Sequence, residues 1–494
     1  MRAYSVAAIR EIEEAAIAEQ GVDALMQRAA GAVAQTAAAI LQRTPGKVYG
    51  SRVLVLVGAG NNGGDALFAS ARLARRGARV TAVRCLGSPH AGGLAALQAA
   101  GGRVVGMDEL GVTGESGPAR RPECDLAIDG VLGIGGRPGL PDAVARLASA
   151  LESSDVPVVA VDLPSGVGAD TGAVPGRSIR ASRTVTFGEL KPCHLLEPAR
   201  SRCGAIDMVD IGLGEMDREP LLVGMDTDQL AMSWPYPQPA TDKYARGVVG
   251  IDAGSNDYPG AGVMATCGAV HGGAGMVRFL GAERPARLIE QRLPNVVFAD
   301  GRVQARLYGS GWGERADGSQ VLAEAAAEEL PVVVDADGLK YLPDPAPGNW
   351  LLTPHAGELA RLLERERGWV EEDPVRAVQA GVERTGATVL LKGAAQVVAS
   401  PDSDVVHVAM PGPAWTAQAG SGDVLGGVCA ALLAAGVEPQ LAGQLGASVQ
   451  ALAASECPGA VPPHRLSEEI GRALGRLERR RDALLAEAAE TPWR

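Results

Sequence analysis

Apolar residues recur at helical spacing over the first 43 residues of the chain. Met26, Ala30, Val33 and Ala37 follow one another at steps of three or four, and Ile40 extends the same stripe. Short and uniformly apolar runs come next, separated by helix-like segments, at residues 53–57, 80–83, 126–128, 158–161, 184–187 and 208–211. Strands that are apolar on both faces are typical of a parallel sheet covered by helices on each side. We therefore expect an α/β domain with crossover helices.

The pattern is interrupted between about residues 214 and 242, where the sequence is proline-rich and weakly periodic, as in Trp234-Pro235-Tyr236-Pro237. A second α/β series follows, with apolar runs at residues 248–251, 331–334, 350–353, 388–391 and 405–408 and a strongly apolar helix over residues 424–435. At 494 residues the chain is too long for one ordinary core. We expect two domains, residues 1–215 and 241–494, joined by a linker over residues 216–240.

The composition narrows the class of function. Hydrophobic residues make up 46% of the chain, aromatic residues only 3%, and glycine occurs 65 times, as in α/β proteins with many backbone loops. A net charge of −12 argues against nucleic acid or an acidic membrane surface as a partner. The seven cysteines are scattered without a CxxC pair, and no apolar run reaches the roughly 18 residues that span a bilayer. We expect a soluble, cytoplasmic protein without disulfides or a zinc site.

The run Gly58-Ala59-Gly60-Asn61-Asn62-Gly63-Gly64-Asp65 directly follows the first apolar strand. Its glycine spacing fits a dinucleotide-binding turn, but the second strand ends in Val83-Arg84-Cys85, without the acidic residue that binds the ribose. An ordinary NAD-dependent dehydrogenase is therefore disfavoured. The alternative is a polar cap for a helix that begins near Ala66, but one such side chain would suffice for a cap. We expect this loop to bind a ligand.

Two further acidic residues follow strands of the same half. Asp129 precedes Gly130-Val131-Leu132-Gly133, and Asp162 precedes Leu163-Pro164-Ser165-Gly166. Because the carboxyl ends of neighbouring parallel strands line one crevice, we expect Asp65, Asp129 and Asp162 to converge there. Oxygen ligands without His or Cys suit a hard cation.

A second glycine loop, Gly420-Ser421-Gly422-Asp423, begins the apolar helix of the second half. Its N–H groups can neutralise a migrating phosphoryl group, and its carboxylate can take the proton of an attacking hydroxyl. The alternative is a plain helix cap. Lys392 and His355 follow other strands and favour the phosphoryl-transfer interpretation, as do Asp335 and Asp337, which we expect to help hold Mg²⁺ and phosphates. The sequence contains no GxxxxGK[ST] motif.

Four motifs of the first half together resemble the NAD(P)H-hydrate epimerase domain: Gly60–Asp65, Asp129…Gly135, Val161–Gly166 and Thr186-Phe187…Lys191-Pro192. The resemblance covers roughly residues 1–215 and implies a Rossmann-like, three-layer α/β/α domain that interconverts the R and S C6 hydrates of NADH and NADPH. It implies Asp162 as the acid/base and a K⁺ ion bound by Asn62, Asp129 and Ser165. The residues implied to bind the hydrated nucleotide are Asn61, Asn62, Gly63, Gly64, Asp65, Gly133, Ile134, Gly135, Gly136, Arg137, Pro138, Gly139 and Asp162.

The second half, from about residue 241 to 460, resembles the ADP-dependent NAD(P)H-hydrate dehydratase, a ribokinase-like α/β fold. The matching motifs are Tyr258-Pro259-Gly260-Ala261, Thr353–Glu358 and Gly420–Asp423. The usual Gly-Pro-Gly-Leu-Gly of that family is Gly309-Ser310-Gly311-Trp312-Gly313 here, and we expect the bulkier Trp312 to alter one pocket wall. The resemblance implies Ala261, Gly311, His355 and Asp423 as contacts of the hydrated nucleotide, and Lys392, Gly393, Ala394, Ala395, Gln396 and Gly422 as contacts of ADP.

Together the two resemblances imply metabolite repair in two steps. The second domain would phosphorylate the C6 hydroxyl of the S hydrate from ADP and eliminate phosphate, with Asp423 as the base and the N–H groups of Gly420, Ser421 and Gly422 as an anion hole. The first domain would supply that epimer from the R hydrate. K⁺, Mg²⁺ and ADP are the implied cofactors, and we expect a homo-oligomer. Two alternatives stay open: a ribokinase-like small-molecule kinase with an N-terminal nucleotide-binding regulatory domain, and a first half that only binds a nucleotide or partner.

Overall fold

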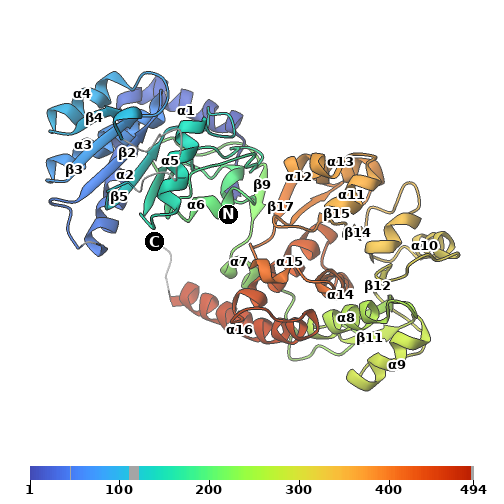
Figure 1. The fold of residues 1–494 in the computed structure, drawn as a ribbon. Coiled ribbons are helices and arrows are strands. Elements are labelled where there is room, and N and C mark those ends of the chain that lie inside the picture. Colours follow the sequence, from blue (N-terminus) through green and yellow to red (C-terminus); the bar gives the residue numbers. More distant parts are fainter. Residues whose placement is uncertain (45, 111–121, 491–494) are drawn as a thin grey trace. The chain divides into compact units, whose positions relative to one another are not determined.

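The computed structural model describes residues 1–44, 46–110 and 122–490 (Figure 1). The chain divides into two compact units, Arg2–Leu221 and Met1 together with Leu222–Arg494. Two elements of the second unit, β9 (Leu222–Gly224) and α7 (Thr227–Ser233), lie within the stretch that we expected to be a linker. Leu230 of α7 is fully buried in the hydrophobic core of this unit.

The apolar stripe near the N-terminus lies on a helix, as predicted. The chain forms β1 (Arg2–Ala3), α1 (Val6–Gln20) and α2 (Val22–Arg43) before the first long strand. Ala30 and Val33 of α2 are buried in the hydrophobic core of the first unit. The amphipathic face of α2 is therefore stabilised by tertiary packing on the sheet.

A seven-stranded parallel sheet forms the centre of the first unit, in the order β4-β3-β2-β5-β6-β7-β8. Alternate residues of β2 show the layering: Val53 and Val55 pack with α2 and α3, whereas Leu54 and Leu56 pack with α5. The predicted three-layer α/β/α architecture is thus confirmed. The strands are β2 (Arg52–Val57), β3 (Arg79–Arg84), β4 (Arg103–Gly106), β5 (Leu126–Gly130), β6 (Val158–Val161), β7 (Arg183–Phe187) and β8 (Ala205–Val209), and the helices are α3 (Asn61–Arg75), α4 (Ala91–Ala99), α5 (Asp142–Glu152) and α6 (Arg200–Cys203).

Both glycine loops end in a helix whose N-cap is a glycine with positive φ. Gly60 (φ +92°) precedes α3, and Gly420 (φ +97°) precedes α14 (Ser421–Ala434). Glycine adopts this conformation without the steric cost of a Cβ. The predicted helix start near Ala66 is wrong, because α3 already begins at Asn61. A Cβ on Gly63 would lie 2.3 Å from the Gly58 carbonyl oxygen, so the missing side chain lets the first turn pack on the loop.

A mixed sheet forms the centre of the second unit, in the order β9-β17-β16-β15-β14-β13-β12-β10-β11. β10 to β15 run parallel to one another, whereas β16 runs antiparallel to both β15 and β17. α14 is apolar on nearly all sides because it packs against α8, α15 and the sheet. The strands are β10 (Val248–Asp252), β11 (Met276–Phe279), β12 (Ala305–Tyr308), β13 (Val332–Val334), β14 (Trp350–Leu352), β15 (Thr388–Leu391), β16 (Val397–Ser400) and β17 (Ser403–Val408). The other helices are α8 (Pro259–His271), α9 (Glu283–Arg292), α10 (Gly318–Ala327), α11 (Ala356–Leu362), α12 (Arg367–Glu372), α13 (Pro374–Thr385), α15 (Pro439–Ser455) and α16 (Pro463–Glu490).

Some strands differ from the sequence prediction. β4, β11, β12 and β16 were not predicted, and the last strand of the first unit lies at Ala205–Val209 instead of 208–211. β4 is an edge strand in which only Val105 is buried, so it lacks an apolar run. Arg278 in β11 and Arg306 in β12 interrupt the apolar pattern, and Arg306 Nε donates to Glu328 Oε2 at 2.8 Å.

The long helix α16 carries four arginines close together near the end of the chain, Arg476, Arg479, Arg480 and Arg481. Arg480 donates to both carboxylate oxygens of Asp228, at 2.7 and 2.9 Å. Arg476 and Arg481 pair with Glu456 and Asp482, so three of these arginines have defined partners within the second unit. Among the residues that the structure describes, no helix combines the length and apolar composition needed to cross a bilayer.

Candidate active sites

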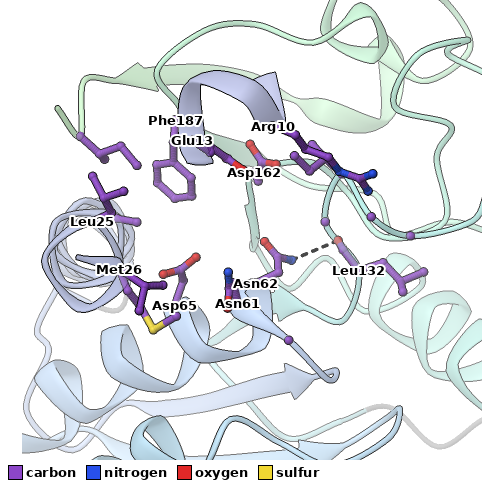
Figure 2. Close-up of a pocket in the computed structure, with 18 of the residues that line it drawn as sticks. Arg10, Glu13, Leu25, Met26, Asn61, Asn62, Asp65, Leu132, Asp162 and Phe187 are labelled. Carbon is purple, nitrogen blue, oxygen red and sulfur yellow. Dashed lines mark hydrogen bonds between the residues drawn. The ribbon is translucent and has the colours of Figure 1, made fainter. Parts of the chain in front are cut away.

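A cavity of about 520 Å³ opens at the carboxyl ends of β2, β5 and β6 in the first unit (Figure 2). The predicted ligand-binding residues that line it are Asn61, Asn62, Asp65, Gly133, Ile134, Gly135, Gly136 and Asp162. Apolar side chains of Leu25, Met26, Phe187 and Leu213 form part of the wall. Apolar walls with a few placed polar groups are typical of sites that bind a ring-containing small molecule.

A buried network holds Asp162 directly after β6. Its backbone has a φ of +64°, a strained conformation for a residue with a side chain. Lys191 Nζ donates to Asp162 Oδ1 at 2.6 Å, and Thr186 Oγ1 donates to the same oxygen at 3.0 Å. The Lys191 side chain is only 1% exposed, so solvent screens this ion pair little. The network fixes both the backbone and the carboxylate of Asp162 at the cavity.

His194 supports Asp162 from the backbone side. The Lys191 N–H donates to His194 Nδ1 at 3.0 Å, so Nε2 carries the proton and donates to the Asp162 carbonyl oxygen, also at 3.0 Å. Burial, followed by the charge of Lys191, lowers the pKa of His194 to about 4. The neutral imidazole therefore positions the backbone of Asp162.

Two more carboxyl groups face the cavity. Asp65 is buried, and its Oδ1 has no hydrogen-bond partner in the part of the chain that the structure describes. Burial raises the pKa of Asp65 well above its usual value, and the charges of Asp162 and Glu13 raise it further. Burial, followed by the charge of Asp162, also raises the pKa of Glu13. The sequence analysis missed Glu13, because it lies on α1 beside the exposed Glu11 and Glu14 and no local pattern distinguishes it.

Asp129, Ser165 and Asn62 lie together next to the cavity. Asp129 accepts hydrogen bonds from Ser165 Oγ at 2.6 Å and from the Ser165 N–H at 2.7 Å. The Asn62 amide nitrogen donates to the Leu132 carbonyl oxygen at 3.0 Å, and Ser165 Oγ lies 3.4 Å from that oxygen. Burial raises the pKa of Asp129 to about 6. Carboxylate, hydroxyl and carbonyl oxygens are thus gathered in one place, a donor set that fits a hard cation.

Not every predicted residue of this half reaches the cavity. Asp65 and Asp162 line it together, whereas Asp129 differs from the expectation because its carboxylate is wholly buried under the Ser165 loop. Gly63 and Gly64 are buried against neighbouring loop and side-chain atoms. The cavity lining ends at Gly136, so Arg137, Pro138 and Gly139 continue the loop beyond it.

In the second unit, Asp423 lies in the first turn of α14 near a buried ion pair. Lys392 Nζ donates to Asp335 Oδ1 at 2.5 Å, and Thr353 Oγ1 and Ser310 Oγ donate to the same carboxylate at 2.9 and 3.0 Å. Burial, followed by the negative charge of Asp335, raises the pKa of Asp423 to about 7, while Lys392 opposes the shift. A carboxyl group that titrates near neutral pH suits a general base.

Lys392 lies close to two other residues that we expect to contact the nucleotides, Gly422 and His355. A Cβ on Gly422 would lie 3.1 Å from Lys392 Nζ, so the ammonium lies against the first turn of α14. His355 and Lys392 form an isolated parallel β-bridge. His355 caps α11, because its Nδ1 accepts hydrogen bonds from the N–H groups of Gly357 and Glu358 at 3.0 and 3.2 Å. Its side chain is 55% exposed, which leaves the ring accessible to a ligand.

α8 brings the other predicted contacts close to the same loop. A Cβ on Gly311 would lie 2.6 Å from Ala261 Cβ, and a Cβ on Gly420 would lie 2.1 Å from Met264 Sδ. The Ser421 N–H already donates to the Gln418 carbonyl oxygen at 3.2 Å, at the entry to the helix. The remaining ADP contacts implied by the resemblance, Gly393, Ala394, Ala395 and Gln396, connect β15 to β16.

Two expectations about this site stay predictions. Asp335 accepts hydrogen bonds from three side-chain donors, and Asp337 accepts one from the Gly313 N–H at 2.8 Å. A role of either carboxylate toward Mg²⁺ would add to these bonds or replace them. Trp312 is 4% exposed, and its Nε1 donates to the Asp252 carbonyl oxygen at 3.0 Å, which holds the indole against the end of β10.

Comparisons with known proteins decide the family. Residues 22–193 match the family model of the YjeF-related protein N-terminus, and residues 249–472 match that of NAD(P)H-hydrate dehydratase. The bifunctional NAD(P)H-hydrate repair enzyme Nnr of Mycobacterium tuberculosis (strain H37Rv) is 44% identical over 446 residues, which cover 88% of this chain and 89% of that protein. The chain belongs to the bifunctional NAD(P)H-hydrate repair enzymes.

Other members and structures resemble this repair enzyme as well. The Nnr enzyme of Mycobacterium leprae is 42% identical, over 96% of this chain and 99% of its own length. A crystal structure of ADP/ATP-dependent NAD(P)H-hydrate dehydratase from Bacillus subtilis, co-crystallised with ATP and Mg²⁺, is 24% identical and covers 51% of this chain and 98% of that chain, with a TM-score of 0.47. The chain is thus an NAD(P)H-hydrate epimerase and an NAD(P)H-hydrate dehydratase in one, not a small-molecule kinase with a regulatory half.

Proposed function

We propose that the cavity of the first unit is the epimerase site and that Asp162 is an acid/base in it. The ion pair between Lys191 and Asp162, at 2.6 Å and buried at the cavity wall, supports this role because it orients one carboxylate toward the ligand space. Residues Asn61–Asp65 and Gly133–Gly139 would bind the hydrated nucleotide. The N-terminus of α3 suits its phosphates, since helix N-termini offer free N–H groups.

We infer that Asn62, Asp129 and Ser165 hold K⁺ beside this cavity. Their oxygen atoms fit the ion, and the positive charge would offset the burial of Asp129. The ion would supply charge and fix the loop that carries Ser165.

We propose that the second site dehydrates the S hydrate by phosphorylation followed by elimination. Asp423 takes the proton of the C6 hydroxyl as its oxygen attacks the terminal phosphorus of ADP, and AMP leaves. The C6–O bond then breaks with loss of phosphate, assisted by the ring nitrogen, and loss of a proton from C5 forms the C5–C6 double bond. The observation that carries this assignment is Asp423 at the start of α14, with a pKa of about 7 beside Lys392 and Asp335.

The proposed binding roles at the second site concern residues close to Asp423 and Lys392. Ala261, Gly311, His355 and Asp423 would contact the hydrated nucleotide, and residues 392–396 with Gly422 would contact ADP. The N–H groups of Gly420, Ser421 and Gly422 would stabilise the phosphoryl group in transit, with Ser421 leaving Gln418 to do so. Mg²⁺ would be held mainly through the nucleotide phosphates and water, because Asp335 is already paired.

The experiment that tests this assignment uses purified protein, mixed hydrated NADH epimers, Mg²⁺, K⁺ and either ADP or ATP. Dihydronicotinamide absorbance should recover only when an adenine nucleotide is present, and Asp423→Asn should abolish the recovery. Recovery without any adenine nucleotide would rule out the phosphorylation step. A stable phosphorylated product would instead indicate a kinase.

The sequence also predicts a cytoplasmic homo-oligomer, and we keep both as proposals. All seven cysteines are free thiols, which supports a reducing compartment. Analytical ultracentrifugation would measure the oligomeric state.

A further inference from the structure

We propose that Asp65 is a second catalytic carboxyl of the epimerase site and acts on the face of the hydrated nicotinamide ring opposite to Asp162. The inference rests on the proposed epimerase function of the cavity. The resemblance to the epimerase family implies only a binding role for Asp65. The geometry also supports a catalytic role, because Asp65 and Asp162 face the same cavity in different electrostatic surroundings.

Asp65 and Asp162 reach the cavity from different elements and lie on opposite sides of its open space (Figure 2). Asp65 belongs to α3, whereas Asp162 follows β6. Leu25, Met26 and Phe187 form an apolar wall along one side of the same space. A ring whose edge rests against this wall would present one face to each carboxyl group.

The surroundings of the two groups favour different protonation states. Asp162 accepts a hydrogen bond from the Lys191 ammonium at 2.6 Å. Asp65 has a buried Oδ1 without a hydrogen-bond partner in the described residues, and the charges that act on it, from Asp162 and Glu13, are both negative. Burial and these two charges raise the pKa of Asp65 well above its usual value. These surroundings favour the protonated form of Asp65, which can donate a hydrogen ion, over the ionised form.

Simpler roles do not account for Asp65. It is not a helix cap, because the N-cap of α3 is Gly60 and no side chain caps that helix. An ionised Asp65 that only bound a sugar hydroxyl would be buried among negative charges without a cation of its own. Glu13 does not replace it, because Glu13 lies on the same side of the cavity as Asp162 (Figure 2).

The step that these groups support is loss and return of water at C6. Asp65 donates its proton to the C6 hydroxyl, the C6–O bond breaks, and water leaves while the lone pair of the ring nitrogen forms an N1–C6 double bond. A water molecule then attacks C6 from the opposite face, and Asp162 takes the released proton. The configuration at C6 is inverted and no electrons are exchanged with another molecule. The site is left with Asp65 ionised and Asp162 protonated, which is the state needed for inversion in the other direction.

The first test measures epimerisation by Asp65→Asn with each separate epimer. We expect kcat to fall by about 10²–10⁴-fold in both directions while KM changes by less than about threefold, because the amide keeps the shape and loses the proton. Asp23→Asn, an exposed residue on α2, is the matched control. A higher KM with unchanged kcat would show that Asp65 only binds substrate and would overturn the proposal.

The second test follows the oxygen atom and does not depend on a variant. In H₂¹⁸O, each enzymatic inversion should place one ¹⁸O at C6, above the exchange measured without enzyme. Inversion with retention of the original oxygen would overturn the proposal, because it would require opening of the ring instead of loss of water. If the wild-type protein fails to interconvert the epimers, the assignment of the epimerase site itself is wrong, which distinguishes the two failures.

Discussion

Lys191 Nζ and Asp162 Oδ1 form a 2.6 Å ion pair, and their side chains are only 1% and 10% exposed. The second unit contains a comparable pair, Lys392 and Asp335, at 2.5 Å. The two pairs act differently in our account. Asp162 of the first pair faces the ligand itself, whereas the second pair stands beside Asp423 and adjusts its charge.

The first prediction concerns Lys191→Met. Removing the ammonium leaves a buried carboxylate without its partner, so we expect the first unit to lose about 3–5 kcal/mol of stability and epimerisation to slow by at least about tenfold. Thermal unfolding and epimer interconversion measure the two effects. The double variant Lys191→Met/Asp162→Asn should recover part of the stability, and the exposed Lys47→Met should change neither. If the Lys191→Met variant were as stable as the wild-type protein, the account would be contradicted.

The second prediction is the pH dependence of dehydration. Asp423 must be ionised to accept a proton, and burial raises its pKa to about 7. The dehydratase kcat should therefore fall about tenfold per pH unit below this value and level off above it. Initial rates with the S hydrate across the pH range measure the profile. If the dehydratase kcat stayed constant below this pH, another group would be the base.

A companion variant, Asp335→Asn, tests the cause of that shift. It removes the negative charge that helps to raise the pKa of Asp423 and leaves the opposing charge of Lys392 in place. The acid limb should move to lower pH in the fraction of protein that stays folded. Movement to higher pH would contradict this sign.

The third prediction concerns Gly422→Ala. A Cβ at this position would lie 3.1 Å from Lys392 Nζ, so the ammonium must move away from the start of α14. We expect weaker binding of ADP, by about tenfold in KM. The higher helix propensity of alanine, about 1 kcal/mol, offsets part of the cost of moving the ammonium within its buried pair with Asp335. Gly471→Ala in α16, where the new Cβ makes ordinary contacts, is the control. Unchanged ADP affinity would show that Lys392 and Gly422 do not contact ADP.

The fourth prediction links K⁺ to pH. Proton and cation compete for the Asp129 carboxylate, whose pKa burial raises to about 6. The K⁺ concentration for half-maximal epimerase activity should rise as the pH falls below this value. Ser165→Ala should raise it at every pH, because the hydroxyl that contacts Asp129 at 2.6 Å is lost. Activity independent of K⁺ would exclude the ion from this site.

Much of the fold could be predicted from sequence, because strands buried on both faces read as apolar runs. β2 and β6 illustrate this, since both are buried along nearly their whole length. The prediction failed where an arginine or an exposed edge interrupts the run, as in β12 and β4. It also misplaced the start of α3, because the tertiary packing of Gly63 overrides its weak helix propensity.

The candidate sites were predictable only in part. Asp162 and Asp423 lie at strand ends or helix starts, where the topology of a parallel sheet gathers side chains. Glu13 could not be found, because its approach to the cavity depends on how α1 packs. The pairing of Lys392 with Asp335 was hidden for a similar reason, since the two residues are 57 positions apart and meet only in the folded sheet.

The most direct test of two consecutive sites on one chain is a complementation experiment with mixed epimers, ADP, Mg²⁺ and K⁺. Asp162→Asn should restore dihydronicotinamide absorbance only until the S hydrate is consumed, and Asp423→Asn alone should restore none. Adding Asp423→Asn protein to the stalled Asp162→Asn reaction should then drive recovery to completion, faster than epimerisation without enzyme. Complete recovery by Asp162→Asn alone at the wild-type rate, or failure of the mixture to go beyond the stall, would contradict the account.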